Sequence, residues 1–79
     1  MDYLEQEVEM LEGMIEAVTY RNDQNGYTVM QVANPNQTIT AVGIIPAAEI
    51  GDQVILKGYY TTHKTYGSQF QVTDRKSVV

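Results

Sequence analysis

The sequence predicts an all-β domain, folded as a small five-stranded barrel of Greek-key topology. Five segments are interpreted as strands, in which side chains alternate between two faces with a period of two. Turn-forming residues separate these segments, and Gly13 and Gly58 fall inside two of them. An interior glycine indicates a bulge or a sharp bend, which a small closed sheet requires. An SH3-like barrel is the alternative.

The first strand is predicted at residues 10–20, after an acidic, aperiodic tail at residues 1–9. The glutamates of this strand mark one face as solvent-exposed, and Met14 and Val18 share that face. The inward face is predicted to carry Leu11, Gly13, Ile15 and Ala17. A polar loop follows at residues 21–26 and ends in Asn25 and Gly26, a pair that is typical of hairpins.

The second and third strands are predicted at residues 27–33 and 38–45, joined by a tight turn at 34–37 that contains Pro35. The pattern of residues 27–33 does not decide which face is buried, because Tyr27 and Val29 lie on one side and Met30 and Val32 on the other. Residues 38–45 are apolar on both faces, which is typical of a central or partly covered strand.

The linker at residues 46–50 has room for at most about one helical turn, with Pro46 at its start. Gly51 and Asp52 then form a turn into a fourth strand at residues 53–60, and a polar connector at 61–68 leads to a fifth strand at 69–73. Phe70 is expected in the core. The barrel therefore spans residues 10–74, and residues 75–79 are a trailing end or the start of a linker.

Size and composition indicate one folded domain with a thin core, since the chain has 79 residues and 43% of them are hydrophobic. It contains no cysteine, which excludes disulfides and cysteine-based zinc sites. No apolar run approaches the roughly 20 residues of a membrane span, and the acidic start does not resemble a signal peptide. We expect a cytoplasmic protein without a membrane partner.

The charge of the chain is concentrated at its start. The formal net charge is -5, and the first sixteen residues hold six acidic residues and no basic one. Residues 17–79 hold five basic and four acidic residues, so the body of the domain is close to neutral. Neither part has the basic footprint of a tight nucleic-acid binder. Any contact with nucleic acid is therefore expected to be weak, or to depend on stacking more than on charge.

Several segments carry a family resemblance: LEGMI at 11–15, YRN at 20–22, NGYTV at 25–29, VGIIP at 42–46, GD at 51–52 with LKG at 56–58, and HKTYGSQF at 63–70. Together they resemble the N-terminal domain of RecD-like ATP-dependent DNA helicases, relatives of the exodeoxyribonuclease V alpha subunit. The resemblance implies an oligonucleotide/oligosaccharide-binding (OB) fold in front of a helicase motor. It also implies that the chain is a piece of a longer protein.

Catalysis is not expected of this chain. It has one histidine, His63, with no cysteine and no cluster of carboxylates near it in the sequence, so neither a catalytic group nor a metal site is predicted. No GxxxxGK[ST] phosphate loop occurs in the 79 residues. We therefore expect no cofactor here, and the resemblance implies ATP and magnesium only for the motor.

Binding is the better-supported class. OB barrels bind single strands with strands two and three and with the loops after strands one and four. The candidate nucleic-acid-binding residues are Arg21, Asn22, Asn25, Tyr27, His63, Lys64 and Tyr66. For the two tyrosines, base stacking and packing at the barrel end are equally consistent with the sequence.

Two functions stay open at this point. The first is a weak single-stranded-DNA-binding module that guides a strand to the motor. The second is a protein-docking module that positions the motor or recruits a partner without touching nucleic acid. The sheet face with Met14, Val18 and Ile44 also offers a surface for self-association, and the oligomeric state stays open.

Overall fold

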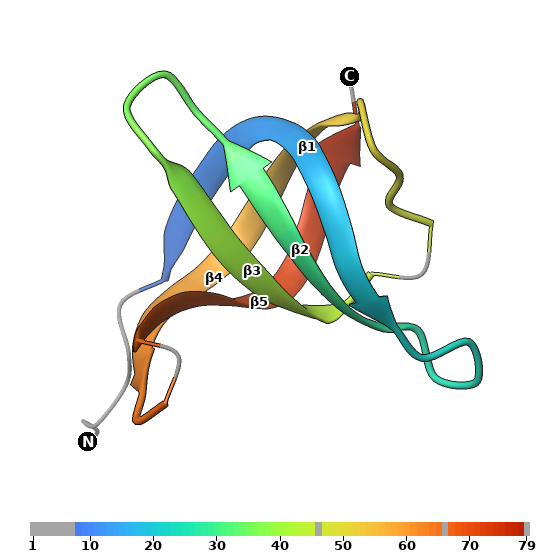
Figure 1. Cartoon of the computed structure of the whole chain (residues 1–79). Coiled ribbons are helices and arrows are strands. Elements are labelled where there is room, and N and C mark those ends of the chain that lie inside the picture. Colours follow the sequence, from blue (N-terminus) through green and yellow to red (C-terminus); the bar gives the residue numbers. More distant parts are fainter. Residues whose placement is uncertain (1–7, 46, 66, 79) are drawn as a thin grey trace.

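The computed structural model of the chain describes residues 8–45, 47–65 and 67–78. Five strands form within them: β1 (Glu9–Arg21), β2 (Tyr27–Ala33), β3 (Thr38–Ile44), β4 (Gln53–His63) and β5 (Gly67–Val78). They close into a barrel in the order β1-β2-β3-β5-β4, and β4 pairs back onto β1 (Figure 1). Only the β3–β5 pair is parallel. The predicted all-β, five-stranded Greek-key barrel is confirmed.

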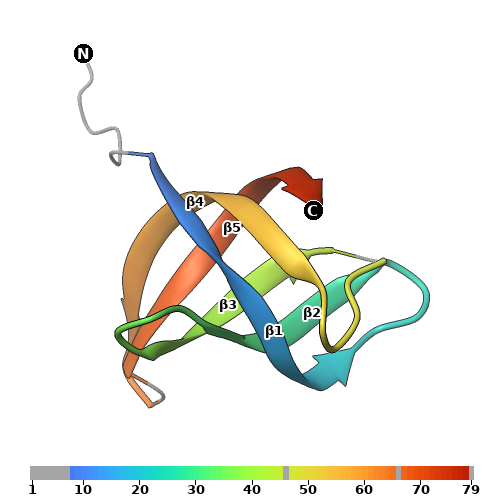
Figure 2. The same ribbon diagram turned by 90° about the horizontal axis from the view of Figure 1, so that it is seen from above.

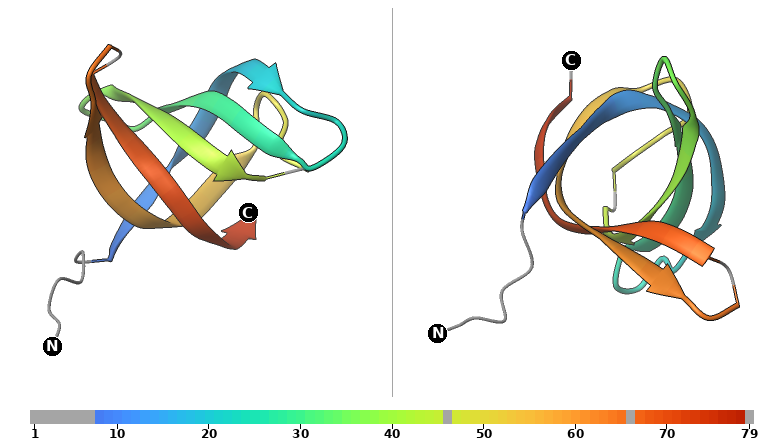
Figure 3. Two further views of the ribbon diagram at one scale, coloured as in Figure 1. Left: turned by 90° about the horizontal axis from the view of Figure 1, so that it is seen from below. Right: turned by 90° about the vertical axis from the view of Figure 1, so that its left-hand side faces the viewer.

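Strand β1 bends around the barrel and takes part in two pairings. Its first half, from Glu9 to Met14, pairs with β4, and its second half, from Met14 to Arg21, pairs with β2. The curve is visible at the start of the chain in Figure 1 and closes the ring in the end-on view of Figure 3. One long strand therefore pairs with both β4 and β2 and so closes the barrel.

Two register shifts in the β1–β2 pairing change which side chains of β1 face the core. They lie between Ile15 and Ala17 and between Val18 and Tyr20. Leu11 and Ile15 are buried as predicted, but Ala17 is only half-buried and Val18 packs against the core. The prediction that Ala17 is inward and Val18 exposed is wrong, because a bulge interrupts the alternation of a strand.

Two glycines allow the strands of the barrel to come close together. A Cβ atom on Gly58 would lie 1.9 Å from the carbonyl oxygen of Gln71, and one on Gly13 would lie 2.4 Å from that of Ala33. Gly58 also adjoins a register shift in the β4–β5 pairing. The predicted bulge at Gly58 is confirmed, and its physical reason is the approach of the β5 backbone.

The core fills the barrel with aliphatic side chains around Phe70. Met30 and Val32 point inward and Tyr27 and Val29 outward, which settles the face of β2 that the pattern left undecided. The buried hydrophobic cluster consists of Leu11, Ile15, Met30, Val32, Ile39, Ala41, Ile45, Ala48, Val54, Leu56, Phe70 and Val72.

The linker between β3 and β4 forms turns over residues 47–52, with no helix there. The linker crosses one end of the ring (Figure 3), and one of its residues, Ala48, is fully buried. Backbone hydrogen bonds join it to the bend of β1: Ile15 N–H donates to Asp52 O (2.9 Å), and Gly51 N–H donates to Ile15 O (2.8 Å). Pro46 lies outside the described residues. None of the described segments is a helix of the length and apolarity that a membrane crossing needs.

The β4–β5 hairpin is longer than predicted at both ends. The expected connector at residues 61–68 is mostly paired strand, since Thr61 lies opposite Gln69 and His63 opposite Gly67. Strand β5 continues to Val78, which lies opposite Val54, so residues 75–78 are part of the barrel and not a trailing end. At the other terminus β1 already begins at Glu9, and residues 1–7 of the predicted tail lie outside the described residues.

Candidate functional site

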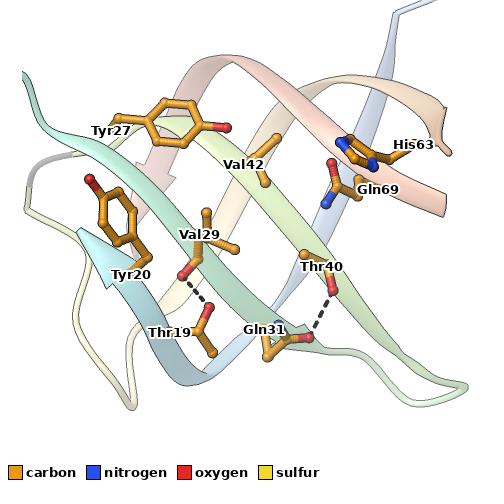
Figure 4. A pocket seen from close by; sticks show the side chains of 9 residues that line it. All are labelled: Thr19, Tyr20, Tyr27, Val29, Gln31, Thr40, Val42, His63 and Gln69. Carbon is orange, nitrogen blue, oxygen red and sulfur yellow. Dashed lines mark hydrogen bonds between the residues drawn. The ribbon is translucent and has the colours of Figure 1, made fainter. Parts of the chain in front are cut away.

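The outer face of β2 and β3 forms the floor of a shallow groove (Figure 4). Cross-strand pairs build this floor: Val29 lies opposite Val42, and Gln31 lies opposite Thr40. The β1–β2 loop and the tip of the β4–β5 hairpin lie on opposite sides of the molecule (Figures 1 and 2). The groove is lined by Thr19, Tyr20, Tyr27, Val29, Gln31, Thr40, Val42, His63 and Gln69.

One end of the groove is aromatic. The side chains of Tyr20 and Tyr27 are 52% and 36% exposed, and Figure 4 shows both rings at the end nearer the β1–β2 loop. Tyr20 reaches this face because the register shift between Val18 and Tyr20 makes Thr19 an extra residue in β1. Two neighbouring residues of β1, Thr19 and Tyr20, thus line the same groove.

The other end of the groove is polar. The Thr40 hydroxyl donates a hydrogen bond to Gln31 Oε1 (3.0 Å). Gln69 is half-buried, and His63 accepts a hydrogen bond at Nδ1 from the backbone N–H of Thr65 (3.0 Å). Amide side chains can both donate to and accept from the edges of bases. The groove therefore combines ring faces for stacking with groups for hydrogen bonding.

Of the seven residues proposed from the sequence, Tyr27 and His63 line the groove. Arg21 does not line it: its side chain is 20% exposed and turned against the β3–β4 linker. There the guanidinium donates to the backbone carbonyl of Ala48 and to Thr28 Oγ1 (3.3 Å), and lies 3.5 Å from the Glu49 carboxylate. Thr28 Oγ1 is itself buried, within 2.9 Å of the Gly26 carbonyl. Arg21 thus ties the end of β1 to the linker.

The two asparagines of the β1–β2 loop are occupied in forming that loop. Asn22 Oδ1 accepts from the backbone N–H groups of Gln24 (2.8 Å) and Asn25 (3.2 Å). Asn25 Oδ1 accepts from the backbone N–H of Tyr27 (2.8 Å). Such side-chain-to-backbone bonds are the usual reason for asparagine in turns. Neither residue lines the groove.

The remaining two candidates are on the β4–β5 hairpin. Lys64 is exposed in its turn and does not line the groove, and Tyr66 lies outside the described residues. The structure thus brings Tyr27 and His63 to one surface and leaves Arg21, Asn22, Asn25 and Lys64 away from it.

Sequence reasoning missed most of the groove. The alternation of β2 and β3 placed the floor residues on shared faces, but it did not tell which face is outward. For Tyr20 no signal was present, because a bulge leaves no mark in the alternation. The missed residues are Thr19, Tyr20, Val29, Gln31, Thr40, Val42 and Gln69.

A second, smaller hollow lies beside β1 and shares no residue with the groove. It is lined by Glu12, Gly13, Met14, Ala33, Asn34, Pro35 and Gln53. Met14 is 41% exposed there, and Met10, on the same outer face of β1, is 54% exposed. Among the residues that the structure describes, no group of three or more His, Cys, Asp or Glu side chains is arranged to hold a metal ion.

Comparison with known proteins agrees with this architecture. No solved structure gives a significant match to the chain. Residues 8–79 match a family model described as ATP-dependent DNA helicase YrrC, OB-fold domain. This match covers almost the whole chain and confirms the resemblance to the N-terminal OB-fold of RecD-like helicases. The chain therefore belongs to the family of the OB-fold domain of ATP-dependent DNA helicase YrrC.

Proposed function

We propose that this domain binds single-stranded DNA weakly in the groove over β2 and β3, and guides the strand toward the helicase motor. The observation that carries the proposal is the pair of exposed tyrosine rings, Tyr20 and Tyr27, at one end of that groove. Stacking of one base on an aromatic ring contributes about 1 to 3 kcal/mol and tolerates any sequence. Since only an unpaired base offers a free face, a single strand is the expected ligand.

Weak binding follows from the charges around the groove. Arg21 is already paired with Glu49 and with the carbonyl of Ala48, and Lys64 stands outside the lining. Contacts to phosphate supply most of the affinity of proteins that bind nucleic acids without sequence preference. A domain that lacks them depends on a motor, which binds the same strand, for its effective affinity. In this proposal ATP hydrolysis belongs to the motor, and the OB domain carries no catalytic group and no cofactor.

The test is fluorescence anisotropy of a labelled oligo-dT titrated with the domain at low salt. Tyr20→Ala and Tyr27→Ala are each expected to weaken binding by about 5- to 150-fold, the loss of one stacked base. Tyr27→Phe keeps the ring and is expected to keep the affinity. Ile50→Ala removes an exposed apolar side chain outside the groove and serves as the matched control. No anisotropy change with folded wild-type protein at high concentration contradicts the proposal.

A second candidate function is docking of the motor without contact to nucleic acid. The observation that favours it is the exposure of two methionines on the outer face of β1: Met14 lines the second hollow, and Met10 lies on the same face. Exposed apolar side chains that lie close together on a surface are typical of protein-binding sites. If docking is the sole function, adding the motor domain shifts the NMR resonances of Met10 and Met14, and adding oligo-dT shifts none in the groove.

A further inference from the structure

The described residues of the groove include no side chain with a fixed charge. Its lining consists of two tyrosines, two valines, two threonines, two glutamines and one histidine. Grooves that follow a single strand along its backbone are normally positively charged, because lysine and arginine contact successive phosphates. The lining of this groove is different, and a phosphate placed on its floor finds no lysine or arginine in the described lining.

The nearby basic residues do not make up for this. The Arg21 guanidinium is held by Thr28, Ala48 and Glu49, so a phosphate has to compete with bonds that the fold already makes. Lys64 stands in the turn of the β4–β5 hairpin, outside the lining.

The floor suits the faces and edges of bases. The cross-strand pair of Val29, which is half-buried, and Val42, which is 3% exposed, lies between the tyrosine end and the glutamine end. At the glutamine end, the Thr40 hydroxyl fixes Gln31 Oε1 and leaves Gln31 Nε2 without an acceptor among the described residues. The amide of Gln69 likewise forms no hydrogen bond with the described residues. These amide groups are available to a base edge.

We propose that the groove holds the bases of a single strand against its floor and leaves the phosphates toward solvent, so that it recognises bases irrespective of backbone charge. The ligand class then includes oligomers with an uncharged backbone. This inference rests on the proposed function, since it describes how the same groove binds a single strand.

The experiment compares oligo-dT with a thymine peptide nucleic acid of equal length, whose backbone is neutral, by anisotropy from about 50 mM to about 200 mM salt. For oligo-dT the slope of log K against log salt is expected between 0 and about -0.7, which corresponds to at most one phosphate contact. The neutral oligomer is expected to bind within about threefold of the DNA, because few counterions are released in either case. Tyr27→Ala is expected to weaken both ligands alike, which shows that both occupy the groove.

Lys64→Gln is the control for contact to phosphate, and is expected to leave both the affinity and the salt slope unchanged. Tight DNA binding with a slope of about -2 or steeper indicates three or more phosphate contacts and overturns the inference, while the proposed function stands. Failure of the neutral oligomer to bind, at any slope, also overturns it. Absence of DNA binding overturns the proposed function and the inference together.

Discussion

The β1–β2 loop and the outer face of β2 and β3 both carry polar side chains, but these polar groups are used differently. In the loop, Asn22 and Asn25 accept hydrogen bonds from the backbone of the loop itself, and Arg21, at the end of β1, is bonded to the linker. In the groove over the sheet, Gln31 Nε2 and the side-chain amide of Gln69, in β5, form no hydrogen bond with the described residues.

The difference has a general cause. A loop has no ladder partner, so its backbone N–H and C=O groups must be satisfied by nearby side chains or by water. In a sheet the ladder satisfies the backbone, and the outward side chains are left for other contacts. Polar residues in a loop are therefore not, by their type alone, binding residues.

Within the sheet, the largest loss of stability is expected at Gly58 in β4, because the absence of a side chain there lets the backbone of β5 come close. Gly58→Ala places a Cβ atom 1.9 Å from the Gln71 carbonyl oxygen, so the two strands must separate. We expect the free energy of unfolding to fall by about 3 kcal/mol, measured by urea denaturation. Gly67→Ala is the control: it has open space but a φ of 81°, and is expected to lose about 1 kcal/mol. Equal losses in both variants contradict the close approach.

Around the loop, the largest loss of stability is expected at Arg21, at the end of β1. Arg21→Ala removes the donors to the Ala48 carbonyl and to Thr28 and leaves both groups short of a partner. The ion pair with Glu49 adds little, because the Glu49 side chain is 72% exposed. We expect a loss of about 2 kcal/mol in the free energy of unfolding, measured by thermal melting. Lys64→Ala, in the hairpin turn, is the matched control and is expected to change stability by less than about 0.5 kcal/mol.

A smaller effect is expected at Asn22. Asn22→Ala leaves the backbone N–H groups of Gln24 and Asn25 to water, at a cost of about 1 kcal/mol. Asn22→Asp keeps an acceptor oxygen and is expected to recover most of the stability. If Asn22→Ala lowers the affinity for oligo-dT while stability is unchanged, the loop takes part in binding.

The smallest effect is expected at Tyr60, which packs on Phe70 with ring centroids 5.0 Å apart and is no part of the groove. Burial, and then the charge of Glu9, raise the pKa of Tyr60 above its usual value of 10.0. The folded state thus favours the neutral phenol. The contribution of this neutral phenol to the free energy of unfolding is fully present below the pKa of Tyr60 in the unfolded chain. It is lost as the pH rises through the higher pKa of the folded state. In Tyr60→Phe, urea denaturation at a series of alkaline pH values is expected to show a smaller fall in stability than in the wild type. An identical fall in both proteins contradicts this prediction.

The barrel was predictable from the sequence because alternation, turn residues and the glycine in β4 all indicate the same closed sheet. The length of β5 was not, since residues 75–78 carry no apolar alternation and are held by pairing with β4. The groove was only partly predictable. Tyr27 and His63 were proposed, but Tyr20 reaches the groove through a bulge in β1, and such a bulge depends on the neighbouring strand.

The most direct test of this division between loop and sheet face is to measure oligo-dT affinity and melting temperature together in Arg21→Ala and Tyr27→Ala. We predict a crossed result: Arg21→Ala lowers the melting temperature and keeps the affinity of the folded protein, whereas Tyr27→Ala keeps the melting temperature and loses affinity. The opposite pattern, in which Arg21→Ala abolishes binding and Tyr27→Ala does not, contradicts the account.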